Sequence, residues 1–380
     1  VINSREIARK YTQEIHCNEI VLLAYYIAAV NIENAFHDLQ PETNTTYIPF
    51  DGICLTDTFQ LGETEEGERL FSEMFPQNSK RVQRQQKVPL RIILGNPPYS
   101  IGQKSANDNA QNQSYPKLDS RIATTYVASS SAGLNKSLYD SYIKAFRWST
   151  DRLDKTGGII AFITNGNWVD KPSMNGFRFY LEQEFSSIYV INLRGAIRGK
   201  SSEAARKEGQ NVFDILTGVA ITLLVKNPDV IGKAKIFYHD IGEYLRRNEK
   251  LHILCKAKTI TSNEFVLENM IPDMHNDWLN YRDSKFEDFF PLIPEKKFDV
   301  KTKTFFNLNV IGVVTNRDNW VYNSSKIKLL EGLTNFLSIY NQLRLDYFKS
   351  PNQKIDEYIE NGGKSIKWTV NLKNDLLKNK

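Results

Sequence analysis

The residues Asn96-Pro97-Pro98-Tyr99 directly follow an apolar run, "RIILG" (91–95), that predicts a short β-strand. Proline fixes its own φ, lacks an N–H group, and also restricts the residue before it to extended conformations. Asn96 and Pro97 are therefore held extended, and the four residues predict a rigid elbow at a strand end. The Asn96 side-chain oxygen and the Pro97 carbonyl oxygen are two acceptors, which suit a ligand with N–H groups to donate.

At the end of a buried strand, this elbow resembles the catalytic motif of amino-methyltransferases that use S-adenosylmethionine. The resemblance implies that Asn96, Pro97, Pro98 and Tyr99 bind a planar amino group that accepts a methyl group. Such an amine is a poor nucleophile because its lone pair is conjugated, and two acceptors for its hydrogens favour the pyramidal transition state. Tyr99 would stack on a base flipped out of the duplex. The alternative is a Pro-Pro turn without chemistry.

The same resemblance implies a cofactor site at neighbouring strand ends, where open α/β sheets bind ligands. Glu19 in "NEIVLLAYYIA" matches the family's acidic residue that accepts hydrogen bonds from both ribose hydroxyls. Asp57 in "LTDTFQL" matches the Asp that accepts from the cofactor's adenine amino group, with Phe59 packing on that ring. The alternative for Glu19 and Asp57 is the capping of a helix or turn. The predicted cofactor-binding residues are Glu19, Ile20, Asp57, Thr58, Phe59 and Asn96.

One feature of the family's pattern is missing from the sequence. Methyltransferases of this fold carry a Gly-rich loop, Asp-Pro-x-x-Gly-x-Gly, after their first strand, and these 380 residues contain no such motif. Residues 1–13 fit the end of the helix that would follow that loop. We therefore expect the first strand and the Gly-rich loop to lie upstream of Val1.

Longer stretches resemble the methyltransferase segment of single-chain type ISP restriction-modification enzymes. They include "NPPYSIGQKSANDNAQNQSYPKLDSRI", "SLYDSYIKAFRWSTDRL", "FITNGNWVD", "FSSIYVINLRG" and "AITLLVKNP", and the resemblance covers most of residues 15–345. The cofactor positions precede the elbow and an extra region follows it, as in adenine-N6 DNA methyltransferases whose target-recognition domain comes last. The resemblance implies double-stranded DNA as partner and a longer chain with nuclease, helicase and target-recognition domains.

A basic, glycine-punctuated stretch, "RGAIRGKSSEAARKEGQN" (194–211, here the basic loop), lies between two predicted strands. Its cations could bind DNA phosphates, and Phe213 just beyond it could give the target base a second stacking face. The alternatives are a merely solvated loop and a core phenylalanine. We predict a solvated linker for "KRVQRQQK" (80–87), and assign "TNRDNW" (315–320) no role beyond a turn. The candidate DNA-binding residues are Phe213, Arg194, Arg198, Lys200, Arg206 and Lys207.

The elements that position these residues follow an alternating pattern of short β-rich runs and helical runs over the first 230 residues, which predicts a parallel α/β sheet. The expected fold is a Rossmann-like methyltransferase sheet with a C-terminal, partly helical region. The predicted domains are residues 1–270, catalytic, and 271–380, leading to the target-recognition domain. An Asn/Gln/Ser-rich insertion is expected at 102–134. Strands are predicted at 14–17, 52–57, 91–95, 157–164, 187–193 and 218–226, and helices at 19–36, 135–153, 176–185 and 324–348.

Composition narrows the possible classes only moderately. The 49 basic and 44 acidic residues give a net charge of +5, which is compatible with a polyanionic partner. Cys17, Cys54 and Cys255 show no pair spacing, which favours a reducing cytoplasm, and no His has metal-ligand spacing, so we expect no metal. The longest apolar run, 20–30, is shorter than the roughly 20 residues that span a bilayer, so we expect no membrane.

The sequence thus predicts transfer of a methyl group from S-adenosylmethionine to the N6 amine of a flipped adenine in double-stranded DNA. One alternative is a methyltransferase for a protein glutamine amide or an RNA base, because the same elbow serves those substrates. Another is a non-catalytic DNA-binding module of the same fold.

Overall fold

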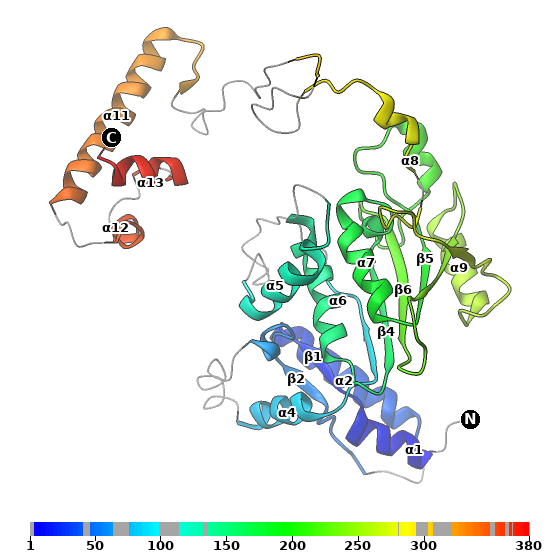
Figure 1. Cartoon of the computed structure of the whole chain (residues 1–380). Helices are drawn as coiled ribbons and strands as arrows, with labels where there is room; N and C mark the ends of the chain where they lie inside the picture. Colours follow the sequence, from blue (N-terminus) through cyan, green and yellow to red (C-terminus); the bar gives the residue numbers. More distant parts are fainter. Residues whose placement is uncertain are drawn as a thin grey trace. The chain divides into compact units, whose positions relative to one another are not determined.

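The computed structural model describes residues 4–40, 46–63, 76–98, 114–131, 136–279, 281–293, 303–306, 321–349, 354–361, 365–366 and 368–379. Tyr99, residues 102–113 and 132–134 of the predicted insertion and "TNRDNW" (315–320) lie outside these described residues. The chain divides into two compact units, Val1–Arg282 and Asp283–Lys380 (Figure 1).

The described strands are β1 (Cys17–Glu19), β2 (Ile53–Leu55), β3 (Ile92–Gly95), β4 (Gly158–Asn165), β5 (Ser187–Asn192), β6 (Val219–Lys226), β7 (Lys235–Asp240) and β8 (Glu268–Met270). β1 and β2 form a parallel pair, and the other six form one sheet in the order β3-β4-β6-β5-β7-β8. β3 is parallel to β4 and β5 is parallel to β7, whereas β6 is antiparallel to both β4 and β5. β8 is antiparallel to β7.

The sheet is therefore mixed, and the prediction of a wholly parallel sheet is wrong at β6. The chain leaves β5 and enters β6 at the same end of the sheet, so the two neighbouring strands run antiparallel. Parallel neighbours would need a crossover connection to the other end of the sheet. The predicted strand at 14–17 overlaps β1 only at Cys17. The sequence analysis did not predict β7 or β8.

The α-helices of the first unit are α1 (Ser4–Arg9), α2 (Leu22–Asp38), α4 (Pro76–Lys87), α5 (Pro116–Ile122), α6 (Ser141–Arg152), α7 (Asn175–Glu184), α8 (Ser202–Glu208) and α9 (Arg247–Ala257). Shorter 3-10 or π-helical turns are η1 (Lys10–Glu14), η2 (Gln60–Gly62), η3 (Ala123–Val127), η4 (Lys136–Tyr139), η5 (Gly166–Trp168) and η6 (Pro172–Met174).

Two predicted loops are instead helical. The stretch 80–87, predicted as a solvated linker, belongs to α4, which buries Val82. The second half of the predicted insertion forms α5 and η3, and Ile122 and Tyr126 there are fully buried. A few apolar residues at helical spacing within a polar stretch therefore outweighed its composition, because they pack on the core.

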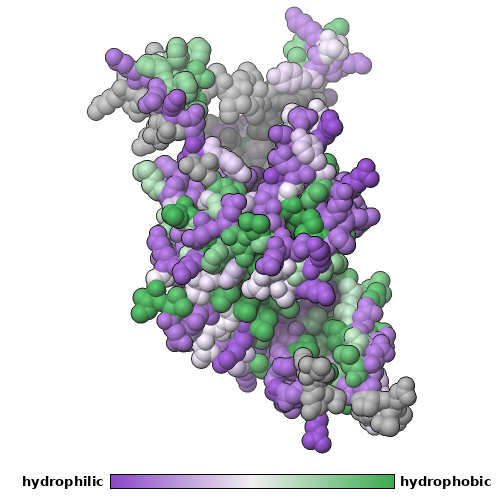
Figure 2. Space-filling view, turned by 90° about the vertical axis from the view of Figure 1, so that its right-hand side faces the viewer, coloured by the Kyte–Doolittle hydropathy of each residue, from purple (hydrophilic) through white to green (hydrophobic). Residues whose placement is uncertain are grey.

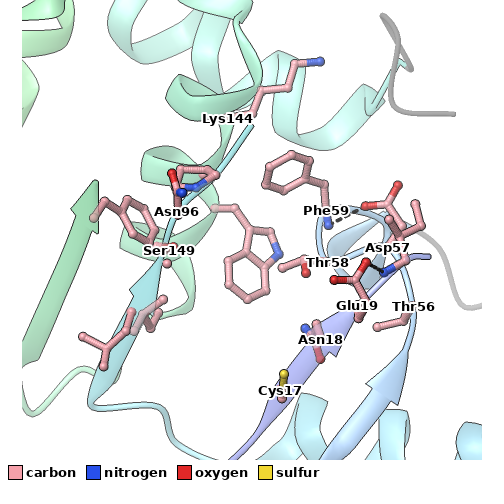
Figure 3. Close-up of a pocket in the computed structure, with 18 of the residues that line it drawn as sticks. Cys17, Asn18, Glu19, Thr56, Asp57, Thr58, Phe59, Asn96, Lys144 and Ser149 are labelled. Atoms are coloured by element: carbon pink, nitrogen blue, oxygen red, sulfur yellow. Dashed lines mark hydrogen bonds between the residues drawn. The ribbon is translucent and has the colours of Figure 1, made fainter. Parts of the chain in front are cut away.

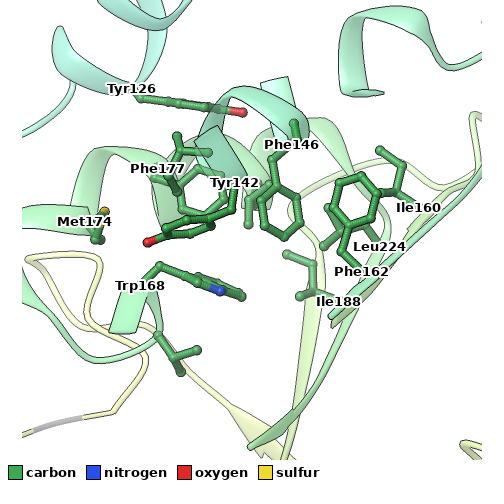
Figure 4. Packing of buried hydrophobic residues seen from close by; sticks show 14 of the residues in the cluster. Tyr126, Tyr142, Phe146, Ile160, Phe162, Trp168, Met174, Phe177, Ile188 and Leu224 are labelled. Atoms are coloured by element: carbon green, nitrogen blue, oxygen red, sulfur yellow. The ribbon is translucent and has the colours of Figure 1, made fainter. Parts of the chain in front are cut away.

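The main core lies where α6 and α7 pack against the sheet (Figure 4). Its centre is aromatic: Phe146, Trp168 and Phe177 are each fully buried. The ring centres of Trp168 and Phe177 lie 5.3 Å apart at an interplanar angle of 79°, and those of Phe146 and Trp168 lie 6.0 Å apart. Edge-to-face aromatic pairs add to the stability gained from burial. This core fixes α6 against β4, the strand next to β3.

Helix α2 is apolar on two faces. Tyr25, Ala28, Ala29, Ile32 and Phe36 follow helical spacing and pack into a small cluster with Tyr11, Phe50 and Ile53, and Phe36 is buried there. The other apolar face, which includes Leu23 at 70% exposure, is uncovered by the residues that the structure describes.

On the face of the molecule shown in Figure 2, apolar side chains lie in small groups among hydrophilic ones. No helix within the described ranges is long and apolar enough to cross a membrane.

The second unit contains η7 (Ser284–Asp288), α11 (Lys326–Phe348), α12 (Ile355–Asn361) and α13 (Val370–Leu377). α11 confirms the long helix predicted at 324–348. Tyr340, Leu343 and Ile366 form a small buried cluster, and the Tyr358 hydroxyl donates to the Leu343 carbonyl at 2.9 Å. This unit therefore has a hydrophobic core of its own.

A buried ion pair fixes the last residues of the first unit to the sheet. Arg178 on α7 is completely buried, and its guanidinium contacts the carboxylate of Asp277, which is 4% exposed. It also donates to the carbonyls of Trp168 at 2.9 Å, Lys171 at 2.8 Å and Asn276 at 2.7 Å. A buried cation with this many acceptors leaves several polar groups without partners when it is removed.

We expect Arg178→Leu to lower the free energy of unfolding by about 3–5 kcal/mol, because the buried carboxylate of Asp277 loses one of its two guanidinium partners and three main-chain carbonyls lose this donor. Arg206→Ala, at an exposed position, should change it by no more than about 0.5 kcal/mol. Urea denaturation followed by circular dichroism measures both. Equal stabilities of the two variants would contradict a stabilising role for the buried guanidinium of Arg178.

Candidate functional site

A cleft of about 510 Å³ opens between the β1–β2 pair and the edge strand β3 (Figure 3). Its walls come from β1, the turn after β2, the end of β3 and one face of α6. The cleft thus collects segments that lie far apart in the sequence. Eight of the candidate residues line it: Glu19, Ile20, Asp57, Thr58, Phe59, Asn96, Pro97 and Pro98.

The elbow forms one wall of the cleft at the carboxyl end of β3. Asn96 is exposed and lines the cleft, so its amide is not buried in the protein's own core. A β-carbon added at Gly95 would lie 3.1 Å from the Phe162 ring, which also lines the cleft. The absence of a side chain at Gly95 therefore lets the strand end approach β4 closely just before the prolines.

Glu19 lies on the opposite side of the cleft from Asn96 (Figure 3). Its carboxylate oxygen Oε1 accepts hydrogen bonds from the main-chain N–H groups of Ile20 and Val21, each at 2.8 Å. The turn-capping alternative is therefore realised in the residues that precede α2. It does not exclude a ligand, because a carboxylate has about four acceptor sites.

Asp57 is held by two donors. Its Oδ1 accepts from the Phe59 N–H at 2.9 Å, and its Oδ2 accepts from the Tyr115 hydroxyl at 2.7 Å. Burial raises the pKa of Tyr115 well above its ordinary value, and the hydrogen bond to Asp57 raises it further, so the hydroxyl stays protonated. The Tyr115 ring packs edge-on against Phe59, with ring centres 5.4 Å apart. One buried tyrosine thus orients both candidate cofactor residues.

Tyr115, Lys144 and Trp148 are among the residues of the cleft wall that were not predicted from the sequence. The Lys144 ammonium lies 2.8 Å from the carboxylate of Asp119 and 4.9 Å from the Tyr115 ring centre. Residues 141, 144, 145 and 148 have helical spacing, which indicates a shared face of α6. That spacing could not indicate what the face meets, because β1 and β2 are far away in the sequence.

Two buried polar atoms in β1 and in the residue just before it have no hydrogen-bond partner within the described part of the chain. They are Nε2 of His16 and Oδ1 of Asn18, and both residues line the cleft. Burial lowers the pKa of His16, as do the nearby cations Arg84 and Arg152, which favours the neutral imidazole. Among the described strands, β1 pairs only with β2, and β3 pairs only with β4. Ile92 and Leu94 of β3 are 64% and 72% exposed. The cleft wall therefore has unused hydrogen-bonding capacity.

The candidate DNA-binding residues lie elsewhere, on the chain between β5 and β6, and none of them lines the cleft. β3, β4, β5 and β7 run in the same direction. Asn96 follows β3 and the basic loop follows β5, so both lie at the end of the sheet where these strands finish. Arg198 and Lys207 are exposed, and Phe213 is 42% exposed, which does not fit a core phenylalanine.

Three of the predicted DNA-binding cations have carboxylate partners within the protein. The Arg194 guanidinium donates to Asp240 at 2.6 Å, the Lys200 ammonium contacts Glu208, and Arg206 lies 3.9 Å from Glu203. These carboxylates offset the positive charge of the basic loop. The described residues contain no cluster of three or more His, Cys, Asp or Glu side chains suited to a metal ion.

The packing in and around the cleft can be probed through the three cysteines of the chain, which are free thiols. Cys255 is exposed, whereas burial raises the pKa of Cys54 to about 11 and also raises that of Cys17, which lines the cleft. At about pH 8 we expect iodoacetamide to modify Cys255 first and Cys54 last, because the thiolate is the reactive form. Cys54 should become reactive as the pH rises toward that pKa. Peptide mass spectrometry measures the order, and Cys54 reacting as fast as Cys255 would contradict the packing of β2.

Residues 304–380 match the family model of the Type ISP C-terminal specificity domain. The whole chain aligns with 30% of a nuclease-deletion mutant of the Type ISP restriction-modification enzyme LlaGI in complex with a DNA substrate mimic, at 40% identity and a TM-score of 0.81. It also aligns with 24% of the ATP-dependent Type ISP restriction-modification enzyme LlaBIII bound to DNA, at 40% identity and a TM-score of 0.79.

A third structure, a DrdV–DNA complex, matches the whole chain at 34% identity and a TM-score of 0.76, over 36% of its own length. A comparison with curated protein sequences found no match. The chain spans between about a quarter and about a third of these three solved proteins. Over its whole length, the chain is thus similar to a segment of Type ISP restriction-modification enzymes, and this similarity supports its interpretation as part of a restriction-modification protein.

Proposed function

We propose that this chain is the methyltransferase segment of a restriction-modification protein, which transfers a methyl group to the N6 amine of an adenine in double-stranded DNA. The observation that carries the proposal is the convergence of Glu19, Asp57 and the elbow on one cleft from three separate strand ends. In open α/β sheets, ligands bind at the carboxyl ends of the strands. The similarity to LlaGI and LlaBIII, whose structures contain DNA, supports the substrate class.

The cleft fits the chemistry of S-adenosylmethionine. The carboxylate of Glu19 has acceptor capacity left for ribose hydroxyls, and that of Asp57 has capacity left for an amino group. The Phe59 ring offers an apolar face, and the unpartnered Oδ1 of Asn18 is a further acceptor in the same wall. When bound, S-adenosylmethionine supplies an electrophilic methyl group. The protein's part is to hold the cofactor and the acceptor amine in line.

The elbow acts on the acceptor amine. The Asn96 side-chain oxygen and the Pro97 carbonyl accept the two amine hydrogens, which localises the lone pair on nitrogen as its geometry becomes pyramidal. These hydrogen bonds strengthen in the transition state, and so they lower the barrier rather than only improving binding. Pro98 keeps Pro97 extended. After transfer the amine is cationic and loses a proton readily, so this scheme requires no dedicated general base.

We propose that a further parallel strand pairs between β1 and β3 and completes the wall of the cofactor site. The support is the pair of edges without partners among the described residues, and the exposed Ile92 and Leu94 between them. The buried, unpartnered Nε2 of His16 and Oδ1 of Asn18 on β1 fit a site that is not yet complete. A Gly-rich loop after such a strand would cradle the amino-acid part of the cofactor.

Recognition of the DNA falls to other parts of the protein. We assign phosphate contacts first to Arg198 and Lys207, which are exposed and whose charges are not offset by an ion pair among the described residues. Phe213 and Tyr99 are the candidate stacking residues for the flipped base. The match of residues 304–380 to a specificity domain supports a role for the second unit in reading the target sequence. Nuclease and helicase domains in a longer chain complete the proposal.

Labelled S-adenosylmethionine distinguishes the substrate classes. The full-length protein is incubated with the labelled cofactor and, in parallel, with unmethylated duplex DNA, RNA and a protein extract. We expect label only in DNA, and digestion to nucleosides should place it on N6 of adenine. Label in protein or RNA alone would overturn the proposal, and failure to bind the cofactor in calorimetry would favour the non-catalytic module.

Asn96→Ala tests the role of the elbow. We expect methyl transfer to fall by at least about 100-fold, because one transition-state acceptor is lost, while cofactor affinity changes little. Asn227→Ala, in an exposed turn, is the matched control and should keep the parental rate. Single-turnover assays and calorimetry measure the two quantities. An Asn96→Ala variant that transfers methyl groups at the parental rate would contradict the mechanism.

Asp57→Ala tests the cofactor site. We expect the affinity for S-adenosylmethionine to fall by about 10- to 100-fold, since a hydrogen bond to a charged group is lost and Phe59 and Tyr115 lose their common partner. Asp229→Ala removes an exposed carboxylate and should leave the affinity unchanged. Isothermal calorimetry on the full-length protein reports both dissociation constants. Equal affinities for the two variants would remove Asp57 from the site.

A further inference from the structure

The chain between β5 and β6 (residues 193–218, the β5–β6 loop) follows a path that glycines permit and side chains hold. Gly195 has φ of +86°, and a β-carbon there would lie 2.8 Å from Nδ2 of Asn211. Gly209 has φ of +67°, and a β-carbon there would lie 2.2 Å from the carbonyl oxygen of Leu245. The loop therefore packs tightly at its base. Its tip, which includes Arg198, is exposed.

Lys250, on α9, reaches this base from outside the loop. Its side chain is completely buried, and its ammonium donates to the carbonyls of Leu193 at 2.8 Å, Glu208 at 3.0 Å and Gln210 at 2.8 Å. Leu193 begins the loop, whereas Glu208 and Gln210 follow the exposed tip. One ammonium thus joins the two stems of the loop with all three of its N–H donors.

Asn211 makes a second connection between the same stems. Its Nδ2 donates to the Gly195 carbonyl at 3.2 Å and to the Thr217 carbonyl at 2.7 Å, and its Oδ1 accepts from the Phe213 N–H at 2.8 Å. Asn211 is 8% exposed. Its side chain therefore fixes the main chain directly at Phe213, two residues further on.

Helix α9 contributes one more contact to this region. The Arg247 N–H donates to the side chain of Gln210 at 3.0 Å, and the Arg247 guanidinium contacts Asp214. Arg247 and Lys250 are three residues apart and so lie on the same face of α9. The first turn of α9 therefore braces the loop on both sides of Phe213.

A buried ammonium is an expensive way to fill space. Burial lowers the pKa of Lys250 to about 8, so the desolvation of its charge is only partly offset, yet the ammonium form still predominates at neutral pH. An apolar side chain of similar length would avoid this cost but would remove the donor that joins the carbonyls of Leu193, Glu208 and Gln210. The charge at Lys250 therefore serves the geometry of the loop more than the filling of the core.

We propose that Lys250 and Asn211 are positioning residues that hold the β5–β6 loop in the shape that presents Arg198, Lys207 and Phe213 to DNA. The inference rests on the proposed function, because it takes the loop as a DNA-contacting surface. It goes further by naming a helix outside that surface as its brace. The hydrogen bonds of Lys250 and Asn211 to the loop stems are here called the clasp. Without the clasp, the loop keeps its charged side chains but no longer holds them in one arrangement.

Lys250→Met in the full-length protein tests the clasp. Binding of a fluorescein-labelled duplex of mixed sequence is measured by anisotropy over a range of salt concentrations. We expect weaker binding at low salt and a plot of log affinity against log salt that is shallower by about 1–2, as two phosphate contacts are lost. Affinity for S-adenosylmethionine should change by less than about 2-fold, since the cleft lies elsewhere. Hydrogen exchange should accelerate at residues 193–218 and not in β4.

Lys256→Met is the matched control, because it makes the same change on the same helix at an exposed lysine that pairs with Glu264 at 2.7 Å. Asn211→Asp is the second variant in case Lys250→Met fails to fold, since it keeps the acceptor for Phe213 and loses both donors. A Lys250→Met protein with the salt dependence and loop exchange of the control would overturn the proposal. If the parental protein binds no DNA, the proposed function fails, whereas hydrogen exchange still tests the clasp itself.

Discussion

Two consecutive prolines at the end of β3 impose the constraint on which the candidate site depends. They hold Asn96 and Pro97 extended beyond the last residue of the strand, where both residues line the cleft. Gly95 lets that strand end approach Phe162 closely, and Phe162 is fixed by the aromatic core beneath α6. The position of Asn96 and Pro97 is therefore tied to the aromatic core of the first unit.

The opposite wall of the cleft has a different origin. Glu19 and Asp57 end two short strands that form a pair apart from the main sheet. Each carboxylate is oriented by main-chain N–H groups, and Asp57 is also held by the buried hydroxyl of Tyr115. Tyr115 precedes α5, which packs on α6, so the same helix supports both walls. This arrangement explains how weakly connected segments can present polar groups at fixed positions across one cleft.

The β5–β6 loop shows how buried polar side chains can hold the path of an exposed, polar segment. Three of its cations pair with carboxylates, which limits the local positive charge. Its stems are joined through buried side chains of Lys250 and Asn211 that bind only main-chain groups. Main-chain recognition of this kind fixes the path of the loop and leaves its exposed side chains available for a partner. The hydrogen bonds at the base of the loop are present whether or not the loop contacts DNA.

The sequence by itself determined the elbow, the strands β2 to β6 and the helices α6, α7 and α11, because strand runs, prolines and helical spacing are local signals. The resemblance of "NEIVLLAYYIA" and "LTDTFQL" to a methyltransferase family also indicated Glu19 and Asp57. Only the tertiary structure decided that β6 runs antiparallel, that 116–127 packs as helix, and that Tyr115 and Lys144 belong to the cleft. The role of Lys250 was equally invisible, because its three partners are main-chain atoms about 40 to 57 residues away. Such contacts depend on where the fold brings carbonyls together, and no pattern of neighbouring residues encodes them.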